Sequence, residues 1–465
     1  MTVHPALRDA RPVPYWLDRA DLRPDPAPEL AGEVRCDLAV VGGGYTGLWT
    51  ALLAKEEDPA REVVLVEART CGWAASGRNG GFCESSLTHG FGNGMARWPE
   101  EMPELLRLGR ENLDAIEAAL ARHGVDCHFE RTGQIVVATE PWQLAGLEEE
   151  VEQAKGLGQD VTFLDAEAVR AEVDSPTYLG GAYWRGDTAL LDPARLAWGL
   201  RAACERLGVR IFEGSPVRSL DAEGDGVRLR TDHGSVRAGR AVLGTNAFPP
   251  LLRRLRRYTV PVYDYALMTE PLTGEQRAAI GWAGRQGLSD AGNQFHYYRL
   301  TPDWRILWGG YDAIYHYGSR IRPEYDQRPQ TFDTLARHFF ATFPQLEGVR
   351  FTHRWGGVID TCSRFCVFFG TALGGRVAYA LGFTGLGVGA THFAARVMLD
   401  LLAGRDTERT RPRMVREKPL PFPPEPLRYA GIQLTRWAIA RADARGGRRN
   451  LWLRALDRLG LGFDS

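Results

Sequence analysis

A glycine-rich turn followed by an acidic residue carries the clearest chemical signal in this sequence. Gly42, Gly44 and Gly47 fit the spacing G-x-G-x-x-G directly after an apolar run, Cys36–Val41. In such a turn the first glycine bends the chain, the second lets a pyrophosphate approach the backbone, and the third lets helix and strand pack closely. Glu67 follows about 20 residues later, where a carboxylate accepts hydrogen bonds from ribose hydroxyls and disfavours a 2′-phosphate. The pattern predicts a bound dinucleotide other than NADP.

A second cluster of small residues, Gly72–Gly81, reads Gly-Trp-Ala-Ala-Ser-Gly-Arg-Asn-Gly-Gly. Small side chains let the backbone approach a cofactor closely. The cluster resembles the GASGRNGG signature of the D-amino-acid oxidase-like family of FAD-dependent amine oxidoreductases, in the version typical of its γ-glutamylputrescine oxidoreductase branch. The resemblance spans about residues 35–405, and three later segments are also similar to elements of this family: Tyr298–Gly310, Trp355–Thr361 and Ala380–Val388.

The resemblance implies that FAD is the cofactor and that several segments meet around it. The helix that starts within Thr384–Val388 would direct its N–H groups at the flavin C2 carbonyl and N1, and so stabilise negative charge on the reduced ring. The expected cofactor-binding residues are Gly42, Gly44, Gly47, Glu67, Ser76, Arg78, Asn79, Gly80, Gly81, Val217, Thr245, Thr384, Gly385, Leu386 and Gly387.

Several positions depart from the family pattern. Arg78 stands where some members attach the flavin through a histidine, so we expect FAD to be held without a covalent bond. Cys362 stands where proline is common, and Leu386 replaces a histidine. Cys362 and Cys366 could form a redox pair, but their spacing favours positions in the core. Trp308 aligns with a lysine that activates oxygen in some oxidases, which favours the broader term oxidoreductase.

Aromatic strands are the candidates for the substrate site. Flavin-dependent amine oxidation needs a neutral amine with its α-C–H aimed at flavin N5, and hydride transfer then gives an imine that hydrolyses. An aromatic wall could hold such an amine and exclude water. We assign catalytic roles to Tyr298, Trp308, His296 and Arg299, with Tyr263 and Tyr265 as further members of the wall. The alternatives are core aromatic residues, a structural histidine, and an arginine at the surface or at a domain interface.

Hydrophobic periodicity places these motifs on alternating strands and helices. Helical spacing covers residues 102–123 and 196–207, while Val63–Val66 and Ala241–Gly244 are typical of buried strands. We therefore expect an α/β fold with a Rossmann-like FAD-binding domain, an inserted antiparallel-sheet substrate domain and a helical C-terminal tail. The expected division is a surface leader (1–33), FAD-binding segments (34–95, 155–258 and 350–410), substrate-domain segments (96–154 and 259–349) and a C-terminal linker with amphipathic helices (411–465).

Composition excludes several classes of function. The 57 basic and 58 acidic side chains nearly cancel, so no overall field attracts nucleic acid. Seven cysteines in 465 residues suggest reduced thiols in a cytoplasmic protein. No His/Cys cluster has the spacing of a metal site. No apolar run has the roughly 20 residues needed to span a membrane.

The tail Glu425–Ser465 falls outside the resemblance. It holds eight arginines and has Leu427, Leu434 and Trp437 at helical spacing, followed by a second cluster that includes Trp452 and Leu456. Two short amphipathic helices fit this pattern. They could dock on a membrane surface and pass electrons to a quinone. The pattern favours packing on the protein itself or on a partner subunit, which would make the protein a homo-oligomer.

The leading hypothesis is an FAD-dependent oxidoreductase that acts on the CH–NH or CH–NH2 group of a small amine or amino acid, such as a γ-glutamylated polyamine. Oxygen or another electron acceptor would then reoxidise the flavin. Two alternatives stay open at this point. One is a dehydrogenase of a similar substrate that passes electrons to a quinone or carrier protein, and the other is a flavin-binding interaction protein without turnover.

Overall fold

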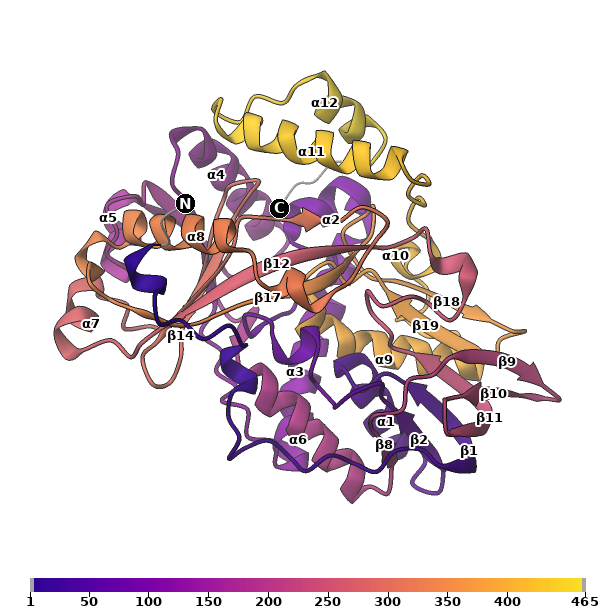
Figure 1. Ribbon diagram of the computed structural model, residues 1–465. Coiled ribbons are helices and arrows are strands. Elements are labelled where there is room, and N and C mark those ends of the chain that lie inside the picture. The colour runs from indigo at the N-terminus through magenta and orange to yellow at the C-terminus, as the bar shows by residue number, and fades with distance from the viewer. Residues whose placement is uncertain (1–3, 462–465) are drawn as a thin grey trace.

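Two large β-sheets divide the chain in the computed structural model, which describes residues 4–461 (Figure 1). The first has eight strands in the order β18-β19-β11-β1-β2-β8, with β10 and β9 continuing from β11. Strands β19, β11, β1, β2 and β8 run parallel. The strands are β1 (Gly32–Val41), β2 (Val63–Val66), β8 (Arg210–Phe212), β9 (Ser219–Glu223), β10 (Gly226–Arg230), β11 (Gly234–Leu243), β18 (Phe368–Ala372) and β19 (Val377–Leu381).

Both faces of this parallel sheet are buried at its centre, which explains why Leu38–Val41, Val63–Val66 and Ala241–Leu243 are apolar throughout. Leu38 and Val40 of β1 belong to the cluster beneath the helices, whereas Ala39 and Val41 belong to the cluster on the opposite face. Helices α1 and α9 pack against each other, and α6 and α3 complete the layer. These helices are α1 (Tyr45–Glu57), α3 (Met102–His123), α6 (Pro193–Arg206) and α9 (Gly387–Ala403).

The second sheet has nine strands in the order β16-β12-β15-β14-β13-β4-β6-β5, with β17 beside β12. Its neighbours are antiparallel except for the pair β13 and β4. The strands are β4 (Gln134–Ala138), β5 (Val161–Asp165), β6 (Gly180–Trp184), β12 (Val260–Thr269), β13 (Gly287–Asp290), β14 (His296–Leu300), β15 (Ile306–Gly310), β16 (Ile314–Tyr315) and β17 (Phe351–Thr361). Helix α8 (Pro329–Thr342) covers one face through Phe332, Leu335 and Phe339.

The remaining elements lie around these two layers. They include the helices α2 (Phe91–Arg97), α4 (Pro141–Gly156), α5 (Ala166–Glu172), α7 (Gly274–Ile280), α10 (Arg413–Arg416), α11 (Leu427–Asp443) and α12 (Leu451–Arg458), and a small antiparallel sheet of two strands, β3 (Phe82–Glu84) and β7 (Thr188–Leu190). The expected α/β fold with a second, largely antiparallel sheet is confirmed.

The sheets divide the chain differently from the expected domain boundaries. Strands β5, β6 and β17 belong to the nine-stranded sheet, although residues 155–258 and 350–410 were expected in the FAD-binding domain. Helix α3 packs on α9 of the eight-stranded unit, although residues 96–154 were expected in the substrate domain. The physical reason is that a strand joins the sheet whose free edge it can pair with in register. The local sequence of the strand does not specify which sheet offers that edge.

The N-terminal leader is not simply a surface segment, because several of its apolar side chains are buried. Trp16 is only 1% exposed and packs with Met268, Leu307 and Trp355 of the nine-stranded sheet. Its indole nitrogen donates a hydrogen bond of 3.0 Å to the carbonyl oxygen of Asn79. Prolines prevent long regular helix in this segment, yet the leader fills a gap beside the Gly72–Gly81 cluster.

The C-terminal helices α11 and α12, yellow in Figure 1, lie across the top of the molecule. Asp443 fastens α11 by accepting hydrogen bonds from the backbone N–H groups of Asn293 and Gln294 at 3.2 and 3.1 Å. The tail therefore packs on its own chain, as expected. The side chains that pack are not the expected ones. Leu427, Leu434 and Trp437 are 65%, 41% and 54% exposed. The residues buried between the two helices are Ala438, Ala442 and Leu453.

Within the described residues no helix is long and apolar enough to cross a membrane.

The two tryptophans at opposite extremes of burial give a test of this arrangement. Trp16→Ala removes a fully buried indole and should lower the free energy of unfolding by about 3–5 kcal/mol, measured by urea denaturation of the purified protein. Trp437→Ala is the matched control, because its side chain is largely exposed, and it should change stability by less than about 0.5 kcal/mol. Equal effects in the two variants would contradict the leader's role in the core.

Candidate active site

The turn between β1 and α1 is shaped by close backbone contacts. A Cβ on Gly47 would lie 1.9 Å from the carbonyl oxygen of Gly42, and a Cβ on Gly42 would lie 2.5 Å from that of Gly244. Gly42 also has a φ of +107°, which L side chains rarely adopt. Gly44 is different, because a Cβ there would meet no backbone atom and only one side-chain atom, Ser76 Oγ, at 3.0 Å. Two glycines thus fix the turn and the third leaves room beside it.

Glu67 directly follows β2 and lies beside this turn. Its Oε2 accepts a hydrogen bond of 2.6 Å from the N–H of Gly43, and its Oε1 accepts from the N–H of Arg69 and the indole of Trp73, each at 2.8 Å. Burial raises the pKa of the Glu67 carboxyl, while these three donors favour its charged form. Oε2 keeps a lone pair for one more donor, which fits a ribose hydroxyl.

Two helices point uncapped N-termini into the same pocket. The N-cap residues of α1 and α9 are Gly44 and Leu386, and neither provides a side-chain hydrogen bond to the first turn. By contrast, Asp192 and Thr273 cap α6 and α7 in this way. Free N–H groups and the positive end of the helix dipole attract anionic or carbonyl oxygens. The first helix is placed to receive phosphates, and the second to face a polar ring edge.

The Gly72–Gly81 cluster passes between the two sheets. The amide oxygen of Asn79 accepts from the N–H of Gly81, and its amide nitrogen donates to the carbonyls of Ala75 and Ser76. Arg78 forms an ion pair with Asp326. These contacts hold the cluster in a tight local loop and join it to the segment before α8.

Arg299 acts at the interface of the two sheets. Its guanidinium donates to the carbonyl oxygens of Leu191 at 2.6 Å and Gly81 at 3.3 Å. Burial lowers its pKa to about 10, so it stays charged at neutral pH. Of the two interpretations of this residue, the structure therefore favours a domain-interface arginine over a partner for a substrate carboxylate.

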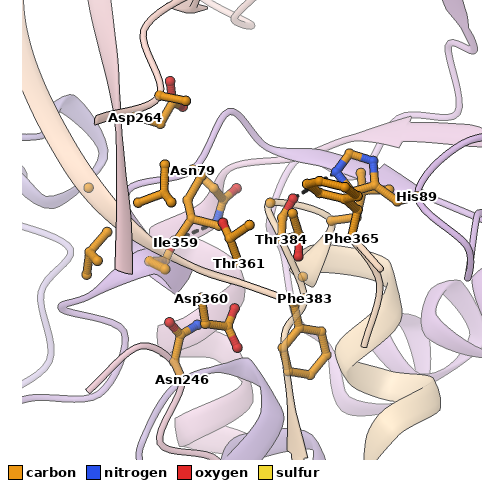
Figure 2. A pocket seen from close by; sticks show the side chains of 18 of the residues that line it. Asn79, His89, Asn246, Asp264, Ile359, Asp360, Thr361, Phe365, Phe383 and Thr384 are labelled. Carbon is orange, nitrogen blue, oxygen red and sulfur yellow. Dashed lines mark hydrogen bonds between the residues drawn. The ribbon is translucent and has the colours of Figure 1, made fainter. Parts of the chain in front are cut away.

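A pocket of about 1100 Å³ extends from the β1–α1 turn to the nine-stranded sheet and the C-terminal helices. Figure 2 shows side chains that face it, including Asn79, Asp264, Asp360 and Thr384. Of the expected cofactor-binding residues, all but Gly47 and Gly81 line this pocket: Gly42, Gly44, Glu67, Ser76, Arg78, Asn79, Gly80, Val217, Thr245, Thr384, Gly385, Leu386 and Gly387. An elongated cavity with a phosphate-type turn at one end fits FAD.

Three of the four expected catalytic side chains lie on the wrong face of the nine-stranded sheet. Tyr298 bonds to the hydroxyl of Tyr178 at 2.7 Å, and Trp308 packs on Phe339 of α8. His296 contacts Asp290 at 2.6 Å. None of these three lines the pocket, because successive side chains of a strand point to opposite faces. The proposed alignment of Trp308 with a residue over the flavin is therefore wrong as well.

The residues next to them in sequence are the ones that face the pocket. Tyr297 lines it, and its hydroxyl donates to Asp264 Oδ2 at 2.6 Å. Sequence reasoning missed both residues, although a lone carboxylate inside the aromatic strand Val260–Thr269 was an available signal. Tyr263 and Tyr265 also border the pocket, but their rings are buried and pack edge-on against Tyr325 and Phe332.

Two further polar residues border the turn before α9. Asp360 accepts from the N–H of Gly382 at 2.6 Å, and burial raises its pKa to about 7. His89 donates through Nε2 to the carbonyl oxygen of Thr384 at 2.9 Å, and burial lowers its pKa to about 4. Figure 2 shows His89 beside Thr384 and Asp360 lower in the view. They fix the chain that leads into the uncapped end of α9.

The two cysteines near this turn face the core. The Cys362 thiol donates to the carbonyl oxygen of Cys366, and burial raises its pKa to about 12. Neither cysteine lines the pocket, and all seven cysteines are free thiols. Within residues 4–461, no group of three or more His, Cys, Asp or Glu could hold a metal ion.

Comparison with known proteins agrees with this geometry. Residues 37–401 match the family model described as DAO, FAD dependent oxidoreductase. The chain is 34% identical over 400 residues to gamma-glutamylputrescine oxidoreductase of Escherichia coli, which covers 83% of this chain and 87% of that protein. The chain belongs to the DAO family. It is an FAD-dependent oxidoreductase that acts on the C–N bond of amines or amino acids.

Other DAO-family proteins extend the comparison. A probable oxidoreductase, OrdL, of Haemophilus influenzae is 28% identical over 82% of this chain and 85% of its own. Among solved structures, glycine oxidase from Geobacillus kaustophilus has a TM-score of 0.67 at 20% identity and covers 80% of this chain and 96% of that one. The similarity to glycine oxidase shows the fold alone.

Gly44 provides a test of the cofactor site. Gly44→Val should abolish FAD binding, because the side chain would fill the space where the backbone must approach the pyrophosphate. The measurement is the FAD-to-protein ratio from absorbance after gel filtration. Gly146→Val is the control, because a Cβ at this α4 position meets nothing within 4 Å. A Gly44→Val protein with the wild-type ratio would contradict the assignment.

Proposed function

We propose that this DAO-family enzyme oxidises the C–N bond of a small amine, with a γ-glutamylated polyamine as the first candidate substrate. The observation that carries the proposal is the continuity of one pocket from the β1–α1 turn to a sheet face bearing Asp264 and Tyr297. The gamma-glutamylputrescine oxidoreductase similarity supports the substrate class. When bound, FAD accepts a hydride from the substrate carbon at its N5, and the resulting imine hydrolyses.

The protein's own residues position the substrate and exclude water. Trp355 seals the pocket beside the Gly72–Gly81 cluster, where its indole donates to the carbonyl oxygen of Arg78 at 2.9 Å. The C-terminal helices form the opposite wall through apolar side chains that include Ile432, Leu453 and Leu456. A dry cavity strengthens electrostatic contacts with the substrate and protects the imine until it is released.

An anaerobic reduction assay tests the proposed function. Mixing the purified holoenzyme with γ-glutamylputrescine should bleach the flavin absorbance, because two electrons pass from the C–N bond to FAD. Sarcosine and D-alanine serve as comparison substrates, since proteins acting on these classes of compound are also similar to this chain. If no amine or amino acid in this set bleaches the flavin, an enzyme of this specificity is excluded.

Exposure to air separates the two candidate enzyme classes. We expect slow reoxidation, because no lysine lines the pocket in the described part of the chain and a lysine over the flavin activates oxygen in some family oxidases. A dehydrogenase that uses a quinone or carrier protein is therefore the second candidate. Rapid reoxidation in air, followed by stopped-flow absorbance, would favour an oxidase instead.

We further propose that FAD is held without a covalent bond. Arg78 occupies the position of a histidyl anchor, and the thiols of Cys362 and Cys366 are buried away from the pocket. Acid precipitation should leave FAD in the supernatant, where its absorbance is measured. Flavin that stays with the precipitate would contradict this, and loss of that flavin in Cys362→Ser would then identify the anchor.

A further inference from the structure

Asp264 lies on an open part of the pocket wall. Val262, Asp264 and Ala266 alternate with Tyr263 and Tyr265 along β12, so they share the face that borders the pocket. The residue directly across from Asp264 on β17 is Gly357, and the partner of Ala266 on β15 is Gly309. The Tyr297 ring fills the space beside Gly309, whereas Gly357 leaves room beside the carboxylate, because a Cβ there would meet only carbon atoms of Arg78 at 3.9 Å. Figure 2 shows it projecting from the strand above Asn79 and Ile359.

Tyr297 fixes the orientation of this carboxylate. Its hydroxyl donates to Oδ2 at 2.6 Å. The ring itself is confined, because a Cβ on Gly309 would lie 2.6 Å from it and a Cβ on Gly80 would lie 2.8 Å from it. Gly80 belongs to the Gly72–Gly81 cluster, so Tyr297 links Asp264 to the cofactor-binding side of the pocket.

The charged groups around Asp264 are already engaged elsewhere. Arg78 is paired with Asp326. Asp312 is paired with Arg328 at 2.9 Å and Arg436 of α11 at 3.6 Å. Within the described residues, no basic side chain forms an ion pair with Asp264, and burial raises the pKa of its carboxyl to about 6. The pocket thus holds an oriented carboxylate that lacks a cation.

We propose that Asp264 binds the ammonium group of the substrate and accepts its proton, with Tyr297 as the positioning residue. The inference rests on the proposed function and narrows it to cationic amines. When a carboxylate and an ammonium ion move together from water into a buried pocket, the neutral acid and the neutral amine become more favourable than they are in water. The proton moves from nitrogen to Asp264, the α-C–H pair leaves as hydride to oxidised FAD, and the nitrogen lone pair becomes the second bond of C=N.

The pH dependence of anaerobic flavin reduction tests this role. The probe is n-pentylamine, and the measured ratio is the limiting rate of flavin reduction divided by the dissociation constant of the amine. In wild type this ratio should be constant between about pH 7 and pH 10, because the reactive pair is the Asp264 carboxylate and the ammonium ion of the amine. In Asp264→Asn only free amine can react, so the ratio should rise tenfold per pH unit throughout that range. A variant that keeps the wild-type plateau would overturn the proposal.

Matched variants separate this role from general effects of charge or folding. Glu150→Gln removes another pocket carboxylate whose pKa burial raises to about 7, and it should keep the plateau. Asp264→Glu should restore part of the plateau, and Tyr297→Phe should lower the ratio with the plateau retained. Equal loss in Glu150→Gln and Asp264→Asn would show that overall negative potential, rather than Asp264, selects the amine.

A binding measurement keeps the inference independent of turnover. tert-Pentylamine has no hydrogen on its amine-bearing carbon and cannot be oxidised. Calorimetric titration of oxidised holoenzyme should show binding at least about tenfold weaker in Asp264→Asn than in wild type, since a charge-assisted contact is lost. Equal affinity, or no binding to wild type, would overturn the proposal. Binding that depends on Asp264 in a protein whose flavin no amine reduces would instead refute the proposed function alone.

Discussion

The close packing of the β1–α1 turn is the constraint on which the rest of the structure depends. Gly47 and Gly42 approach so closely that a Cβ on Gly47 would lie 1.9 Å from the Gly42 carbonyl oxygen. This contact brings the start of α1 to the carboxyl end of the parallel strands, where Gly44 cannot cap it. The N–H of Tyr45 donates to Ser76 Oγ at 3.0 Å, so the N–H groups that follow it in the first turn of α1 remain for a phosphate, which is the general solution of parallel α/β sheets. The pocket extends from this point.

The nine-stranded sheet must then be held at a fixed position against this cofactor site. Arg299 and the leader residue Trp16 both bond to backbone carbonyls of the Gly72–Gly81 cluster, at Gly81 and Asn79. Each is almost completely buried. Without these carbonyl partners, the buried guanidinium and indole would each destabilise the folded protein by several kcal/mol. The two sheets are thereby locked in one relative position, with α8 on the far face and the pocket on the near one.

The C-terminal helices complete the pocket, although they lie outside the matched family region, which ends at residue 401. Several of their residues border the cavity, while Leu434 and Trp437 remain exposed and do not line it. This wall comes from a separate segment of the chain and can vary without disturbing the cofactor site. The segment contacts the nine-stranded sheet mainly through side chains, including Asp443, which accepts hydrogen bonds from the backbone of Asn293 and Gln294.

The sequence by itself predicted residues that the structure brings together around one pocket, and it predicted several strands and helices. The expected strand Val63–Val66 and the expected helix over 102–123 agree with β2 and α3, because periodicity and glycine spacing are local properties of the chain. Glycine spacing also identified the turn whose backbone contacts leave no room for side chains.

Only the tertiary structure decided which strand residues face the pocket. Tyr297 and Tyr298 are adjacent and chemically alike, and a shift of one residue exchanges the two faces of a strand. Local sequence could not choose between them, because the choice depends on which face α8 covers. Likewise, the assignment of β17 to the nine-stranded sheet follows from its long pairing with β12. Contacts between segments far apart in the chain set the pairing partners, the buried faces and the position of the tail. Local sequence patterns do not specify such contacts.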